Sequence, residues 1–182
     1  MAAASHVSTD LPASSGYGRV VEDLRATSHE PEGYRCPFCA LIAGTPMDAP
    51  IAADVVAERE RAVAFISPRW WARNPRHVIV VPRTHVENLY DITSPDLHGV
   101  MDLVQEVARG MRGSYGCSGV STRQHNEPDG DQDVWHLHVH VFPRYPDDRL
   151  YETRPLDVFV PSEERASFAR RLRTVLGTRM GS

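Results

Sequence analysis

Apolar residues recur with the two-residue spacing of β-strands in several stretches of the chain. Between residues 51 and 66 they predict two short strands joined by a turn near Glu58–Arg61. A buried strand is predicted at Val78–Val81, and further strands are predicted at 119–124 and 134–142. Together these segments predict a mostly antiparallel sheet of about five strands.

A different spacing, of three and four residues, predicts an amphipathic helix over residues 94–115. Ser94 suits the N-cap, Pro95 suits the first helical position, and Gly116 suits the end of the helix. The apolar stripe consists of Leu97, Val100, Met101, Val104, Ala108 and Met111. A second, basic amphipathic helix is predicted at 161–177. The expected fold class is therefore α+β, with one long helix beside the sheet and a C-terminal helical tail.

Composition divides the chain into three parts. Residues 1–33 are rich in Ala, Ser, Gly and Pro, and they are expected to form a flexible N-terminal arm. Residues 34–150 hold the predicted sheet and long helix, and 151–182 form a C-terminal extension with the helical tail. Neither a secretory signal nor a membrane-spanning stretch is visible, and three cysteines do not make a disulfide framework. A cytoplasmic protein without a membrane partner is expected.

All 20 basic residues are arginine, because the chain contains no lysine. This excludes a Schiff-base lysine and a Walker-type phosphate lysine. The formal net charge is −4, so a basic surface for polymeric nucleic acid is not expected. If the protein handles phosphate, it must use arginine, histidine, backbone N–H groups or a metal.

Three of the nine histidines alternate with apolar residues in the run His136-Leu137-His138-Val139-His140. In a strand, alternate residues point to one face, so the three imidazoles would share the face opposite the core. A solvated polar face is the simplest explanation for one histidine, but three favour a metal site or phosphate transfer. Adjacent positions on a flat strand cannot easily converge on one ion. One histidine is therefore expected to reach a metal held elsewhere, which leaves two for phosphate chemistry.

The extended run from His136 to Phe142, HLHVHVF, resembles the H-φ-H-φ-H-φ-φ signature of the histidine triad (HIT) family of nucleotidyl hydrolases and transferases. The sequence NPRHVIVVPRTH at 74–85 resembles the P-x-H-φ-φ-φ-φ-P-x-x-H segment of that family. The sequence CPFC at 36–39 resembles the zinc half-site of many members. The resemblance runs from Cys36 to about Tyr145, roughly 60% of the chain. It implies a HIT-like fold for this part of the protein.

The resemblance also implies roles for individual residues. The middle histidine of the family is the nucleophile, so His138 is expected to form a nucleotidyl-histidine intermediate that water then resolves. His140 would hydrogen-bond the transferring phosphate. Asn126 resembles an amide that contacts phosphate or ribose, and Gln132 resembles a glutamine whose segment cradles the phosphate. His77 matches a histidine near the nucleophile.

The sequence departs from the family pattern at two places. Asp131 and Asp133 stand where many members have Gly and Ser or Thr. A carboxylate repels phosphate unless it is paired or protonated, so Asp133 is expected to relay a proton to the leaving group or to bind a divalent cation. No acidic or amide ribose ligand aligns, which leaves Ser67 and Arg69 as the candidates for that role.

Cys36 and Cys39 supply two of the four ligands that zinc prefers. His85 and His136 would complete a Cys2His2 site, as the zinc-bearing relatives of the family imply, and such a site would be structural. A redox pair is one alternative for C-x-x-C, although the motif does not stand at the start of a βαβ unit. A pair of core cysteines without metal is the other.

The resemblance implies a hydrolase that cleaves a P–N or P–O bond at the α-phosphate of a nucleoside phosphoramidate or a dinucleoside polyphosphate. The nucleotide is expected to be a purine nucleotide, with adenosine as the base-bearing group, and the protein a homodimer. Two other functions stay open. One is a nucleotidyltransferase or phosphorylase that uses inorganic phosphate, and the other is a zinc-stabilised nucleotide-binding module without chemistry. Trp70 and Trp71 are candidates for stacking on the base or for packing.

Overall fold

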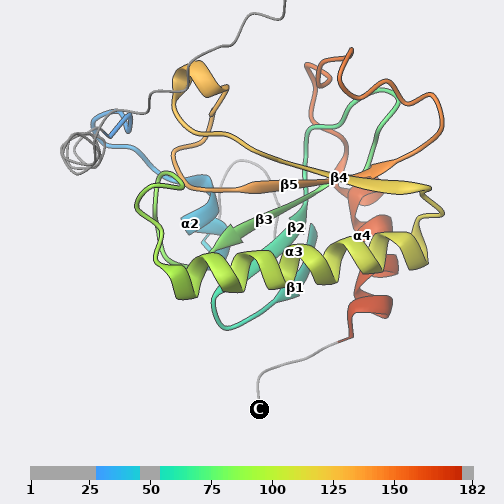
Figure 1. Ribbon diagram of the computed structural model, residues 1–182, viewed down its shortest axis with the longest axis horizontal. Coiled ribbons are helices and arrows are strands. Elements are labelled where there is room, and N and C mark those ends of the chain that lie inside the picture. The colour runs from blue at the N-terminus through green and yellow to red at the C-terminus, as the bar shows by residue number, and fades with distance from the viewer. Residues whose placement is uncertain (1–27, 46–53, 178–182) are drawn as a thin grey trace, which may run out of the picture.

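The computed structural model describes residues 28–45 and 54–177. Its centre is a five-stranded antiparallel sheet with the strand order β1-β2-β3-β5-β4 (Figure 1). The strands are β1 (Val55–Glu58), β2 (Ala62–Ile66), β3 (Val78–Pro82), β4 (Gly119–Gln124) and β5 (Val139–Arg144). The predicted α+β fold is confirmed. Residues 1–27 of the predicted arm and 51–53 of the first predicted strand lie outside the described residues.

The strand that carries the histidine run is shorter than predicted, because β5 begins at Val139 and not at residue 134. A tight bend precedes it, in which the His136 N–H donates to the carbonyl oxygen of Val134 at 2.8 Å. The Leu137 N–H then donates to the carbonyl oxygen of Val86 at 2.7 Å. The prediction of one straight strand over 134–142 is therefore wrong in its first half, and the first two histidines of the run, His136 and His138, lie outside the strand.

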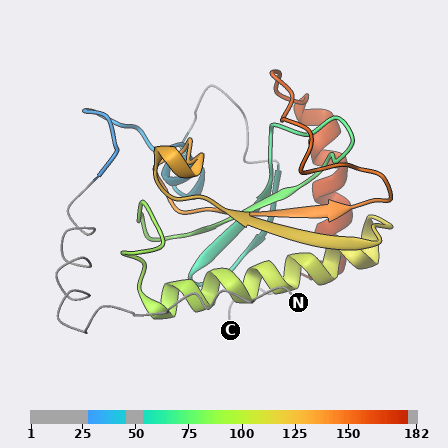
Figure 2. The same ribbon diagram turned by 45° about the horizontal axis from the view of Figure 1, so that its top comes forward.

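Alternation along the strands gives the sheet two apolar faces. On one face the helix α3 (Ser94–Ser114) runs along the sheet (Figure 2) and packs on Ala62, Ala64, Ile66, Val78, Val80, Val139 and Val141. On the other face Phe38 of the short helix α2 (Pro37–Ile42) packs with Val63, Phe65, Ile79 and Val81. Because both faces of β2 and β3 are buried, these strands are continuous apolar runs.

The long helix α3 differs from its prediction at its start and in its stripe. The N-cap is Thr93, whose Oγ1 accepts a hydrogen bond from the Asp96 N–H at 3.3 Å. Ser94 is the first helical residue, so its prediction as the cap is wrong. The stripe that faces the core is rotated slightly from the predicted one, and it consists of Val100, Leu103, Val104, Val107 and Met111. Met101 does not belong to it, because that side chain is 48% exposed.

The predicted C-terminal helix is α4 (Ser162–Leu176), and it packs against α3 and β1. Arg165 Nε lies 2.9 Å from Asp54 Oδ2, and both residues are buried. Burial raises the pKa of Asp54 to about 6. Removing one partner of such a buried pair costs about 3–5 kcal/mol, because the other charge is left uncompensated, and this pair joins α4 to the residue that precedes β1. None of the helices in the described part of the chain combines the length and apolar character that crossing a bilayer requires.

The segment between β5 and α4 returns to the loop that follows β2. The Leu156 N–H donates to the carbonyl oxygen of Trp70 at 2.7 Å, and the Val160 N–H donates to that of Pro68 at 2.8 Å. This part of the predicted extension 151–182 is therefore attached to the main domain by backbone hydrogen bonds.

Candidate functional site

A cavity of about 800 Å³ lies on the sheet face opposite α3. Its walls come from α2, the loop after β2, the loop between β4 and β5, and the segment 153–159. Three of the histidines that the motifs single out line it, namely His77, His138 and His140. Residues that are more than 60 positions apart in the sequence thus meet at one place.

His138 is buried at the cavity wall. Its Nδ1–H donates to the carbonyl oxygen of His136 at 2.8 Å, which fixes the tautomer and leaves the lone pair on Nε2. This Nε2 lies 4.0 Å from Oδ1 of Asp133, another residue of the lining. Burial lowers the pKa of His138, so the ring is neutral at pH 7. A neutral imidazole with a free lone pair is a nucleophile.

His77 and His140 lie side by side in the cavity, with ring centroids 5.2 Å apart. His77 stacks on Phe142 at 4.5 Å, and the ring of His140 is 5.0 Å from that of His138. Burial, together with the positive charge of Arg123, lowers the pKa of His77 to about 3, and burial also lowers the pKa of His140. Among the described residues, neither ring nitrogen of His77 nor Nδ1 of His140 has a hydrogen-bond partner. Buried polar atoms without partners are typical of a site that takes a polar ligand.

Asn126 and Gln132 do not line the cavity but hold the loop between β4 and β5. Gln132 is buried, its Nε2 donates to the carbonyl oxygen of Glu87 at 2.7 Å, and its Oε1 accepts from the Glu127 N–H at 2.9 Å. Asn126 Oδ1 accepts from the Leu89 N–H at 2.8 Å. Both amides are thus engaged in positioning the loop, and their contact with substrate stays a prediction.

The two loop aspartates and both candidate ribose ligands line the cavity. The side chain of Asp133 is 71% exposed, so its carboxylate remains hydrated beside His138. The hydroxyl of Ser67 donates to the carbonyl oxygen of Arg69 at 3.0 Å. The guanidinium carbon of Arg69 lies 5.6 Å from the ring centroid of Phe159. The loop after β2 therefore brings a hydroxyl and a cation to the same wall.

Trp70 and Trp71 have different environments, which separates the two roles expected for them. Trp70 is 4% exposed and packs edge-on against Phe168 of α4, so it is a core residue. Trp71 lines the cavity and meets the ring of His77 edge-on at 5.3 Å. Only Trp71 of the pair is positioned to contact a ligand.

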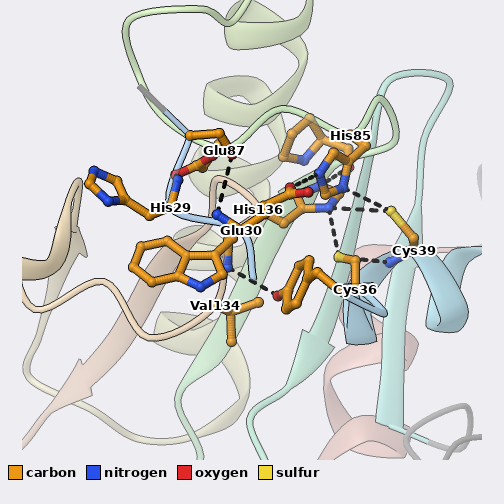
Figure 3. A network of polar contacts seen from close by, with 12 residues as sticks. His29, Glu30, Cys36, Cys39, His85, Glu87, Val134 and His136 are labelled. Atoms are coloured by element: carbon orange, nitrogen blue, oxygen red, sulfur yellow. Dashed lines mark hydrogen bonds and ion pairs between the residues drawn. The ribbon is translucent and has the colours of Figure 1, made fainter. Parts of the chain in front are cut away.

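The four residues predicted to bind zinc, Cys36, Cys39, His85 and His136, form a second group that we call the Cys–His cluster. Their ligand atoms all lie within 4.8 Å of one another. Nδ1 of His136 is 3.3 Å from Cys36 Sγ and 3.6 Å from Cys39 Sγ, and Nδ1 of His85 is 3.1 Å from Cys39 Sγ. Figure 3 shows the side chains of the cluster pointing toward one another.

The far nitrogen of each cluster histidine has an acceptor. Nε2–H of His136 donates to the carbonyl oxygen of Pro82 at 3.1 Å, and Nε2–H of His85 donates to Oε1 of Glu30 at 2.5 Å (Figure 3). A proton on Nε2 leaves Nδ1 free to bind a metal. Burial raises the pKa of Cys39 to about 12, so its thiolate form requires a nearby cation. Two thiols and two imidazoles fit a structural zinc ion.

Some cavity residues were not singled out by the sequence. Phe38 separates the cluster from the cavity, with its ring 5.7 Å from that of His136 and 5.4 Å from that of His138. Arg123 lies opposite His140 in the β4–β5 ladder, a position that pairing the two predicted strands would have found. The segment 153–159 carries no motif, and only the fold brings it to the cavity.

A family model described as the HIT domain matches residues 49–147. The chain is 34% identical over 110 residues to a Bacillus subtilis protein named Protein hit, which covers 60% of this chain and 71% of that protein. Over 72 residues it is 36% identical to a Saccharomyces cerevisiae bis(5'-adenosyl)-triphosphatase, which covers 39% of this chain and 35% of the yeast protein.

Among solved structures, a zinc-bound histidine triad family protein from Mycobacterium smegmatis matches with a TM-score of 0.63 and 30% sequence identity. The match covers 78% of this chain and 92% of that one. The residues matched by the family model include every histidine of the cavity and of the Cys–His cluster, whereas Cys36 and Cys39 precede them.

Proposed function

Because the chain belongs to the HIT domain family, we propose that it hydrolyses nucleotide conjugates at the α-phosphate with His138 as the nucleophile. The observation that carries this proposal is the 2.8 Å hydrogen bond from His138 Nδ1 to the carbonyl oxygen of His136. It leaves a lone pair on Nε2 of a neutral, buried ring beside the cavity residue Asp133. Such a nitrogen is suited to attack phosphorus.

In the proposed reaction the Nε2 lone pair attacks the α-phosphorus, an N–P bond forms, and the bond from phosphorus to the leaving group breaks. The leaving group departs with the bonding electron pair and takes a proton that the Asp133 carboxyl group relays from solvent. Water then attacks the same phosphorus and releases a proton to solvent through Asp133, and the N–P bond breaks and returns its electron pair to Nε2. The products are a nucleoside monophosphate and the protonated leaving group.

The neighbouring residues have supporting roles in the proposal. His140 hydrogen-bonds the transferring phosphate, and His77 packs against His140 and Phe142, which keeps the ring of His140 in place. Gln132 and Asn126 act by holding the loop that carries Asp133. Binding of a divalent cation by Asp133 remains a prediction.

The proposed substrates are a nucleoside phosphoramidate or a dinucleoside polyphosphate in which the nucleoside is adenosine. The likeness to a bis(5'-adenosyl)-triphosphatase supports the second class. The half-buried Trp71 in the cavity lining supports stacking on a purine, and Ser67 or Arg69 would contact the ribose. Transfer to inorganic phosphate would give a nucleoside diphosphate instead of a monophosphate, so the products formed with and without phosphate distinguish the two reactions.

Zinc held by Cys36, Cys39, His85 and His136 would be structural, because four protein ligands leave no open position for substrate. The cluster residues join α2, the end of β3 and the bend before His138, so the ion would stabilise the wall from which the nucleophile projects. A homodimer and a cytoplasmic location remain predictions from the sequence.

The test uses adenosine 5′-phosphoramidate and diadenosine triphosphate as substrates. The reaction is stopped by denaturation without acid, and the mass of the intact protein is measured by mass spectrometry. We expect AMP release from at least one substrate and a transient mass increase of one adenylyl group. His138→Asn should abolish both, whereas His98→Asn, on the exposed side of α3, should change neither. An adduct that forms on the His138→Asn protein would assign the nucleophile to another residue.

A further inference from the structure

Arg123 lies on β4 directly opposite His140 on β5. Opposite residues of an antiparallel pair share one face of the sheet, and both of these residues line the cavity. The guanidinium carbon of Arg123 lies 4.8 Å from the ring centroid of Tyr151, 5.2 Å from that of Phe142 and 5.8 Å from that of Trp71. The three rings hold the planar group in place and leave it half-buried.

Arg144 provides a comparison, because its guanidinium also lies over Tyr151, at 5.0 Å. Nε and Nη2 of Arg144 each lie 2.7 Å from a carboxylate oxygen of Asp148, so the charge of Arg144 is paired. Arg123 donates from Nη2 to the carbonyl oxygen of Leu150 at 3.2 Å, and no ion pair between described residues includes it. Guanidinium has five N–H donors, so Arg123 retains donors for an anion.

Two other arginines, Arg69 and Arg154, line the cavity, but both are exposed. A charge that is partly removed from water attracts an anion more strongly than an exposed one, because solvent screens it less. The histidines beside Arg123 are neutral, since burial lowers the pKa of His77 and of His140. Arg123 therefore supplies a fixed positive charge next to His140.

We propose that Arg123 forms a subsite for an anionic group of the substrate beyond the α-phosphate, such as the second phosphate of a dinucleoside polyphosphate. The inference rests on the proposed function, in which His138 and His140 hold the α-phosphate. Adjacent strands are about 4.8 Å apart, so Arg123 lies one strand spacing away from His140 across the sheet. A phosphate bonded to the α-phosphate would lie within reach of a side chain at that position. Arg123 then favours polyphosphate substrates over conjugates whose leaving group carries no anion.

The experiment uses calorimetry to measure the affinities of the zinc-loaded protein for AMP and ADP, which differ by the second phosphate. No further divalent cation is added to the buffer. We expect the wild type to bind ADP about 10-fold to 100-fold more tightly than AMP, the range for a charge-assisted hydrogen-bonded pair. Arg123→Met, which keeps the length of the side chain without its charge, should remove this preference. Arg123→Lys should keep part of it, and Arg170→Met, on the exposed side of α4, should keep all of it.

Equal affinity of the wild type for AMP and ADP, or an undiminished preference in Arg123→Met, would overturn the subsite. Zinc content and melting temperature of each variant show whether it is folded, and the Arg123→Lys protein tests the charge if the methionine variant is not. Failure of the proposed function has a different signature, namely no AMP release by the wild type from either adenosine 5′-phosphoramidate or diadenosine triphosphate. The two failures are therefore distinguishable.

Discussion

The Cys–His cluster and the cavity use neighbouring histidines in opposite ways. Both nitrogens of His136 have partners, the cysteine sulfurs at Nδ1 and the Pro82 carbonyl oxygen at Nε2. His77 and His140 keep ring nitrogens without a partner among the described residues, although both are buried or nearly so. The two regions therefore differ in how many of their histidine ring nitrogens have a partner. A histidine whose far nitrogen is held by an acceptor is oriented to bind an ion through the other nitrogen, whereas buried ring nitrogens without a partner are suited to bind a polar ligand.

The largest effect is expected from a substitution in the cavity, which tests whether the cavity and the Cys–His cluster act independently. His138→Asn removes the proposed nucleophile, so turnover should fall by roughly 10⁴-fold or more, as it does when the nucleophile of a catalytic group is removed. Zinc content, measured by atomic absorption, should stay at the wild-type level because His138 is not part of the cluster. A His138→Asn protein that has lost its zinc would show that the two regions are not separate.

His136→Asn is the reciprocal change and should act on stability. It removes one cluster ligand, so zinc content should fall and the melting temperature should drop by about 10 °C. This corresponds to roughly 4 kcal/mol of ligand-linked stability in a chain of this size. Treating the wild type with a chelator should lower its melting temperature by a similar amount. If the chelator removes a bound metal and leaves the melting temperature unchanged, the ion does not stabilise the fold.

A smaller effect is expected at Glu30, the acceptor for Nε2–H of His85. Glu30→Ala should weaken zinc binding by about 10-fold to 100-fold, because the acceptor orients the histidine and increases its basicity. Competition with a chromogenic chelator measures the affinity. Glu32→Ala is the matched control, since Glu32 is an exposed carboxylate on the same segment. Equal losses in both variants would point to a general charge effect.

The smallest effect concerns the cavity and its dependence on pH. The pKa of His77 is lowered by burial from 6.5 to about 3, so the unfolded chain binds a proton in this interval that the folded protein does not. The free energy of unfolding should therefore fall as the pH drops below 6.5, by up to about 1.4 kcal/mol per pH unit for this residue.

The measurement is denaturant unfolding between pH 6.5 and the pH at which zinc content begins to fall. His77→Phe keeps an aromatic ring against Phe142 and removes the proton, so its stability should depend less steeply on pH than that of the wild type. His98→Asn, which changes an exposed histidine, should keep the wild-type slope. Identical slopes for wild type and His77→Phe would show that His77 does not contribute.

The sequence predicted those parts of the candidate site whose residues belong to a local motif. The run 136–140, the segment 74–85 and the CPFC motif identify five histidines and two cysteines that the structure gathers in the cavity and the cluster. They do not report the hydrogen bonds of Gln132, because its partner Glu87 lies 45 residues away. Nor do they report the bend at Val134 that separates His136 from the strand, since alternation alone does not show where a ladder begins.

The sequence by itself determined the local elements: five strands, the long helix and the terminal helix follow from the spacing of apolar residues. It also singled out the three alternating histidines to which the proposal assigns metal binding and chemistry, because their alternation is a local property. Only the tertiary structure decided that Arg123 stands beside His140 and that the segment 153–159 closes the cavity. The physical reason is that these contacts depend on strand pairing and chain return over long separations, which no periodicity along the chain records.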